Sequence, residues 1–162
     1  MSYGAASWSF TKDDQTAISQ VLERFLSESQ AKCALIVDRS GQLVTTAGEQ
    51  PRFDAQAFAS LTAADFSAND QLARLVGETD FNTLFHQGER ESMLLADVAR
   101  RVILVVLFDN KTTLGLVKLK LKSTVEQLTR QFASIGTRAE RPAAERRPLL
   151  GNVDEEIDKL FQ

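Results

Sequence analysis

The stretch RVILVVLF, residues 101–108, is one arginine followed by a continuous run of apolar, mostly β-branched side chains. A strand with one solvated face alternates apolar and polar residues, whereas this run has no polar position after its first residue. We therefore predict a strand that is covered on both faces and lies at the centre of a sheet.

Further strands are predicted on both sides of this run. The segment AKCALIVDRSGQLVTTAG, residues 31–48, holds two β-rich runs separated by DRSG, an acidic turn starter followed by a glycine. Such a turn joins antiparallel strands into a hairpin. NTLFHQ at 82–87 and ESMLLADV at 91–98 also have strand patterns. Together these runs predict a five-stranded antiparallel sheet.

Three helical patterns accompany the strands. Residues 12–29 carry apolar side chains at helical spacing, with Thr11 or Asp13 as the candidate N-cap. A second helix follows Pro51, with Asp54 as its predicted N-cap, and ends at Gly77. Residues 117–122 alternate like a strand, but a longer helical stripe outweighs that pattern: Leu114, Val117, Leu121, Val125, Leu128, Phe132 and Ile135. Leu116 and Leu119 fall off this stripe, so they pack at a sheet edge or meet another chain.

The predicted fold class is α+β, a single domain with the order α-β-β-α-β-β-β-α. Residues 1–11 form an N-terminal extension, residues 12–136 the domain, and residues 137–151 an Arg-, Ala- and Pro-rich linker. The last residues, 152–162, have the pattern of a short amphipathic helix. A helix of that length is marginal alone in water, so it is expected to dock on its own domain or on a partner.

Composition excludes several classes of function. A net charge of -3 over 162 residues gives no electrostatic reason to expect a nucleic-acid partner. The sequence has one cysteine and one histidine, which excludes a disulfide framework, a cysteine cluster and a histidine-pair metal site. We expect Cys33 to be a buried apolar residue and His86 a hydrogen-bonded strand residue. Neither a secretory signal nor a membrane helix is recognisable, so a cytoplasmic protein is expected.

Motifs for enzyme chemistry are also missing. The sequence has neither the phosphate-binding pattern GxxxxGK[ST] nor GxGxxG. Carboxylates near basic residues, as in DVAR and GERES, are interpreted as surface charges. The lysines at 111, 118, 120 and 122 are interpreted as a solvated face, with contact to an acidic protein as the alternative. We predict no catalytic residues, no metal and no cofactor.

Several stretches carry a family resemblance: AKCALIVDRSGQLVTTAG, SLTAADFSANDQLARLVGE, FHQGER, LFDNKTTLGLV and the closing DEEIDKLF. In this order they resemble the Roadblock family, and within it the MglB-type proteins. The resemblance implies a bacterial homodimer that activates a Ras-like polarity GTPase of the MglA type, without chemistry of its own and without inserting an arginine finger. Concentration at a cell pole is a further implication. Residues 1–10 have no counterpart in this pattern.

The resemblance also implies sites. The GTPase is expected on the second helix, where a helical wheel gives a stripe of small and polar residues: Ser60, Ala63, Ala64, Ser67 and Gln71. The wheel assigns the sheet-facing stripe to Phe58, Leu61, Ala68, Leu72, Leu75 and Val76. The opposite face, a candidate dimer interface, holds Ala59, Phe66 and Ala73. In the tail, a second GTPase contact associated with nucleotide exchange is expected at Val153, Ile157, Leu160 and Phe161.

Two alternatives remain open at this point. The first is a Roadblock scaffold that binds a GTPase or another polarity protein without accelerating hydrolysis. The second is a small-ligand sensor, since related antiparallel-sheet domains hold ligands. A sensor needs a well-formed pocket with convergent polar groups, and the predicted strands show no cluster of such residues.

Overall fold

The computed structural model describes residues 10–136. Its elements are α1 (Lys12–Ser29), β1 (Cys33–Asp38), β2 (Leu43–Gly48), α2 (Ala55–Leu75), β3 (Thr83–Gln87), β4 (Ser92–Val98) and β5 (Val102–Phe108). A further helix runs from residue 114 to residue 136, the last described position. The predicted order of helices and strands is therefore confirmed. The linker and the tail helix predicted for 137–162 lie outside the described residues.

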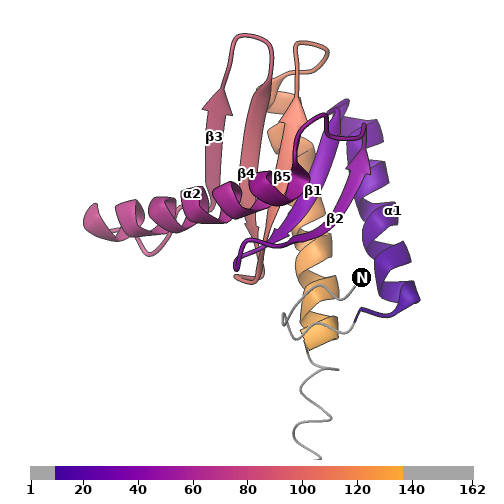
Figure 1. Cartoon of the computed structure of the whole chain (residues 1–162), viewed down its shortest axis with the longest axis horizontal. Coiled ribbons are helices and arrows are strands. Elements are labelled where there is room, and N and C mark those ends of the chain that lie inside the picture. The colour runs from indigo at the N-terminus through magenta and orange to yellow at the C-terminus, as the bar shows by residue number, and fades with distance from the viewer. Residues whose placement is uncertain (1–9, 137–162) are drawn as a thin grey trace, which may run out of the picture.

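The sheet has the order β2-β1-β5-β4-β3, and every neighbouring pair is antiparallel. β5, the continuous apolar run, occupies the centre, and all but one of its residues are buried. β2 and β3 form the two edges. The prediction of a doubly covered central strand is confirmed, because α2 lies on one face of the sheet and α1 and the 114–136 helix on the other (Figure 1).

Two apolar clusters fill the space between these layers. The larger cluster joins α1 and the 114–136 helix to one face of the sheet through residues such as Leu22, Phe25, Leu104 and Phe132. The smaller cluster lies under α2 and is built around Phe66 and residues of β1, β4 and β5. Burial of this kind supplies most of the free energy of folding, at about 25 cal/mol per Å² of apolar surface.

The helix starts agree with the predicted caps. Thr11 caps α1 with a reciprocal capping box, since its hydroxyl accepts from the Asp14 backbone N–H and the Asp14 carboxylate accepts from the Thr11 backbone N–H. Asp54 caps α2 by accepting from the backbone N–H groups of Gln56 and Ala57. Each cap satisfies donors that a helix leaves without partners in its first turn.

The DRSG turn brings β1 and β2 close to α2. Gly41 has φ +94°, and a Cβ at this position would lie 3.2 Å from the Cα of Ser60 on α2. A side chain here would thus be strained by its backbone conformation and would press on the helix. The glycine therefore sets how closely α2 approaches the sheet.

The β4–β5 turn is strained. Ala99 and Arg100 both have left-handed φ, 56° and 57°, at positions where Asn and Gly are the favoured residues. The side chain of Arg100 is mostly exposed and reaches Asp80 only at 3.5 Å, an ion pair of little value in water.

We expect Arg100→Gly to raise the free energy of unfolding by about 0.5–1 kcal/mol, because glycine adopts positive φ without a Cβ clash. The measurement is urea denaturation of the two proteins. The matched control is Arg90→Gly, in a turn where the arginine does not have positive φ. If Arg100→Gly lowers the free energy of unfolding as much as Arg90→Gly does, the backbone at Arg100 is not strained.

Candidate functional site

α2 crosses one face of the sheet and projects beyond its β3 edge (Figure 1). Its sheet-facing side is made of small and polar residues with one large side chain. The buried positions of the helix are Ala59, Thr62, Ala63, Phe66, Asn69 and Ala73. Three alanines in this set let the helix lie close to the strands, and Phe66 fills the remaining space with 1% of its surface exposed.

The predicted faces of α2 are therefore wrong. Ala59, Phe66 and Ala73, assigned to an outward dimer contact, are buried against the sheet and present no surface to a second chain. The residues assigned to the sheet lie outside, apart from Phe58, which is partly buried. The physical reason is that the sheet side chains already fill this layer, so the helix packs through its small residues.

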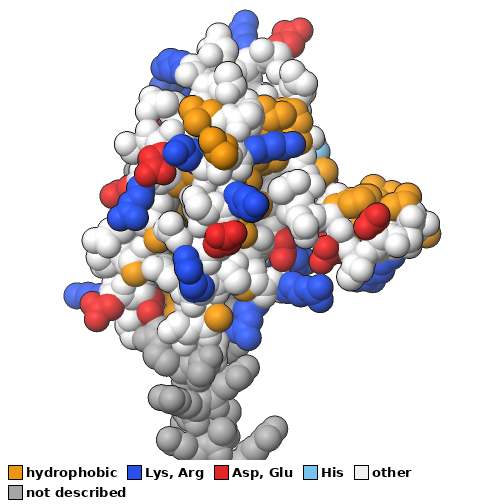
Figure 2. Space-filling view, turned by 180° about the vertical axis from the view of Figure 1, so that it is seen from behind, with side chains coloured by type: hydrophobic (Ala, Val, Ile, Leu, Met, Phe, Trp, Pro, Cys, Tyr) orange, Lys and Arg blue, Asp and Glu red, His pale blue; other side chains and the backbone are white. Residues whose placement is uncertain are grey.

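The outward side of α2 carries large apolar residues that nothing in the described chain covers. The exposed fractions are Leu61 71%, Leu72 57%, Leu75 82% and Val76 69%. Leu72 and Leu75 lie in the last turn of α2 and Val76 directly follows it, and we call these three residues the apolar band. Hydrophobic side chains gather on the projecting end of this helix (Figure 2). A patch of this kind on a folded domain indicates an interaction surface.

The predicted GTPase-binding stripe is largely at the surface. Ser60, Ala64, Ser67 and Gln71 are exposed, whereas Ala63 is buried at 8% and packs toward the β1–β2 turn. Ala63 is therefore withdrawn from the stripe. The four remaining residues have short or flexible side chains on one side of the helix. The predicted tail contacts Val153, Ile157, Leu160 and Phe161 lie outside the described residues.

An arginine that the sequence pattern did not single out connects α2 to the sheet. Arg39, in the β1–β2 turn, donates from Nη1 to the Asp70 carboxylate of α2 at 2.8 Å and from Nη2 to the Asp97 carboxylate of β4. Its guanidinium carbon lies 5.2 Å from the centre of the Phe66 ring. Burial lowers the pKa of Arg39, but the hydrogen bonds to Asp97 and Asp70 outweigh it and raise that pKa. The guanidinium is therefore charged at every physiological pH.

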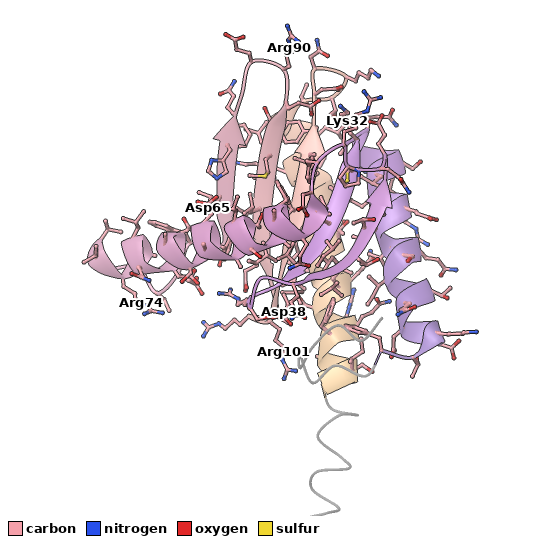
Figure 3. All side chains as sticks on the ribbon, viewed as in Figure 1. Lys32, Asp38, Asp65, Arg74, Arg90 and Arg101 are labelled. Carbon is pink, nitrogen blue, oxygen red and sulfur yellow. The ribbon has the colours of Figure 1, made fainter. Side chains whose placement is uncertain are left out.

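A second contact joins α2 to the edge strand β3. His86 Nε2 lies 2.6 Å from the Asp65 carboxylate. Figure 3 shows Asp65 on the side of α2 that faces the upper part of β3. The expectation that His86 is a hydrogen-bonded strand residue is confirmed. This contact aligns the middle of α2 with the open edge of the sheet.

A cavity with a volume of about 480 Å³ lies between the β2–α2 loop and the sheet. Phe53, Leu107 and Cys33 give it apolar walls, and Lys32 at its rim donates to Glu91 at 2.6 Å. This hydrogen bond to Glu91 raises the pKa of Lys32. Burial, with a smaller contribution from Glu49, raises the pKa of the Cys33 thiol to about 11. The cysteine is therefore a protonated wall residue, as expected from its apolar sequence context.

The described residues show few other features that could support a reaction or a binding site. Within residues 10–136, no group of three or more His, Cys, Asp or Glu side chains could hold a metal ion. In the same part of the chain, no helix combines the length and apolar character needed to cross a membrane. The features that remain are surfaces, namely the exposed stripe and the apolar band on α2.

Comparisons with known proteins agree with this arrangement. A family model described as the Roadblock/LC7 domain matches residues 17–108. Solved MglB from Myxococcus xanthus is 42% identical, over 74% of this chain and 97% of that chain, with a TM-score of 0.71. The gliding protein MglB from Thermus thermophilus is 32% identical, over 78% and 96%, with a TM-score of 0.73.

A third solved structure, described as MglB with tetrameric arrangement, is 30% identical over 81% of this chain and 98% of that chain, with a TM-score of 0.75. The family model spans more than half of the sequence and includes α2 and all five strands. The similarity to the MglB structures covers nearly their whole length. By sequence, by strand order and by the placement of its helices, this chain belongs to the Roadblock/LC7 family.

Proposed function

We propose that this chain is a homodimeric, non-enzymatic regulator that accelerates GTP hydrolysis by a small Ras-like GTPase of the MglA type, in bacterial polarity and motility. The observation that carries the proposal is the outward side of α2. It presents a stripe of small residues beside an apolar band, on a chain 42% identical to MglB over 97% of that protein. A regulator of this kind needs contact surfaces and no reactive groups of its own.

The apolar band is the proposed dimer contact, in place of Ala59, Phe66 and Ala73. The three residues of the apolar band lie in the last turn of α2 or directly after it, and this end of the helix projects beyond the edge strand β3 (Figure 1). An edge strand offers unpaired backbone groups to a second strand. A two-fold axis would bring two copies of β3 and two helix ends together and would cover both features at once.

The stripe of Ser60, Ala64, Ser67 and Gln71 is the proposed GTPase contact. Its short side chains let a partner approach the helix backbone closely, which favours shape complementarity over a contact made by single large residues. The regulator then acts by holding the catalytic groups that the GTPase already owns in their reactive positions. The tail residues Val153, Ile157, Leu160 and Phe161 are a proposed second contact that promotes nucleotide exchange.

The dimer gives a direct prediction. Leu72→Asp combined with Leu75→Asp should raise the dissociation constant of the dimer at least ~100-fold, since burying each leucine is worth about 1.5–3 kcal/mol. Sedimentation velocity over a concentration series measures it. Ser123→Asp combined with Ser134→Asp is the matched control, because both serines are exposed on the 114–136 helix at the opposite face of the sheet. If both double variants change the dissociation constant equally, the assignment of the apolar band to the dimer contact is contradicted.

The partner is tested by co-purification. The chain, carrying an affinity tag, is purified from its native cells in the presence of a non-hydrolysable GTP analogue or of GDP. A small Ras-like GTPase that is recovered with the analogue, and less with GDP, supports the proposal. If no GTP-binding protein is recovered in either case, the function as a GTPase regulator is contradicted.

A further inference from the structure

The guanidinium of Arg39 bonds two carboxylates that belong to different elements. It lies in a short turn whose shape is fixed by its neighbours. The Asp38 carboxylate accepts from the Ser40 backbone N–H at 2.9 Å, and the Gly41 N–H donates to the Asp38 carbonyl at 2.9 Å. The turn therefore holds Arg39 in place, with its side chain between α2 and the sheet.

The two Nη groups of Arg39 reach two different elements. One bonds Asp70 on α2 and the other Asp97 on β4, while the Phe66 ring of α2 packs against the guanidinium. The planar fork of arginine suits such a bridge, because it fixes two carboxylates at defined directions. Lysine, a single point charge, would hold them less rigidly.

Asp70 also marks the end of the side-chain hydrogen bonds that join α2 to the rest of the domain. The first half of α2 is tied to the turn by Gln56 Nε2 and Ser60 Oγ, which donate to the Gly41 carbonyl. Further along, Asn69 Nδ2 donates to the Phe81 carbonyl at a long 3.4 Å. Within the described residues, Asp70 is the last position of α2 whose side chain bonds to the rest of the domain. Beyond it only Ala73 is buried.

The proposed contact surfaces lie at this same end. Ser67 and Gln71 of the stripe flank Asp70, and the apolar band begins at Leu72. The ion pairs of Arg39 are mostly buried, with exposed side-chain fractions of 32% for Arg39, 19% for Asp70 and 20% for Asp97. The cost of desolvating such charges offsets much of their attraction, so the main effect of the bridge is on geometry. We propose that Arg39 is a positioning residue, which holds the outer half of α2, residues 66–75, at the angle at which it meets the GTPase. This inference rests on the proposed function.

The test measures position and activation separately. Hydrogen exchange of backbone amides is followed by mass spectrometry in the full chain, in Arg39→Lys and in Asp70→Asn. GTP hydrolysis by the GTPase is measured with each protein at saturating concentration. Glu91→Gln is the control, because it breaks the 2.6 Å pair with Lys32, which lies apart from the outer half of α2.

Both variants should exchange residues 66–75 roughly tenfold faster, as expected for the loss of a charged hydrogen bond, with β1 and β5 unchanged. They should also lower the maximal hydrolysis rate severalfold, which a change in affinity alone would not do. Glu91→Gln should change neither quantity.

Unchanged exchange over 66–75 in both variants would overturn the positioning role. Faster exchange with a full maximal rate would overturn the link to activation. If the wild-type chain accelerates no hydrolysis, the proposed function fails, and the exchange result still decides what Arg39 does.

Discussion

Phe66→Ala is expected to lower the free energy of unfolding by about 3–5 kcal/mol, the range for removing a fully buried aromatic side chain. Phe66 is 1% exposed and joins residues of β1, β4 and β5 in the cluster under α2. Its loss leaves a cavity between the helix and the sheet and removes the ring against which Arg39 packs. Urea or thermal denaturation measures the change.

The informative comparison is Leu61→Ala on the same helix. Leu61 is 71% exposed, so removing its side chain should change the free energy of unfolding by no more than about 0.5 kcal/mol. The two helical faces are thereby tested against each other. A small effect of Phe66→Ala together with a large effect of Leu61→Ala would show that the helix packs through its leucines instead.

Ser67→Arg and Gln71→Arg carry the second large prediction. Each puts a long charged side chain on the exposed stripe of α2 and should abolish GTPase binding, because the added side chain overfills a surface that depends on shape complementarity. Fold and dimer should be unaffected, because neither residue is buried or belongs to the apolar band. The measurements are GTPase binding by calorimetry and dimer content by sedimentation.

Ser123→Arg is the control for these two changes. Ser123 is an exposed serine on the 114–136 helix, at the other face of the sheet. The same charge added there should leave GTPase binding unchanged. Normal binding by both Ser67→Arg and Gln71→Arg would remove the stripe from the proposed interface, whatever the behaviour of the control.

The backbone of this fold could be predicted well from the sequence. Thr11 and Asp54 cap the first two helices as expected, and the uninterrupted apolar run became the central strand β5. These features depend on local rules, namely cap chemistry, turn residues and the period of the apolar positions. Local rules are carried by neighbouring residues, so the sequence alone displays them.

The orientation of α2 could not be predicted in this way. The helix carries apolar residues on more than one side, and a helical wheel assigns the bulkiest apolar stripe to the core. In the structure three alanines and Phe66 face the sheet, because β1 and β5 already fill that layer with large side chains. The leucines stay outside because the space available to a helix depends on the strands beneath it, which the helix sequence does not describe.

The Arg39 bridge was missed for a related reason. Arg39, Asp70 and Asp97 lie in a turn, a helix and a strand, and Arg39 is separated by 31 positions from Asp70 and by 58 from Asp97. No spacing rule relates them, and only the folded chain brings their charges together. In the sequence the arginine is simply one residue of a hairpin turn.

The measurement that tests the central claim most directly is GTP hydrolysis by the cell's small Ras-like GTPase, with and without this chain. Single-turnover conditions with excess regulator separate the hydrolysis step from nucleotide exchange. We predict a clear acceleration by the wild-type chain that Gln71→Arg abolishes. Binding without acceleration would support the scaffold alternative, and hydrolysis at the intrinsic rate with no binding would contradict the proposed function.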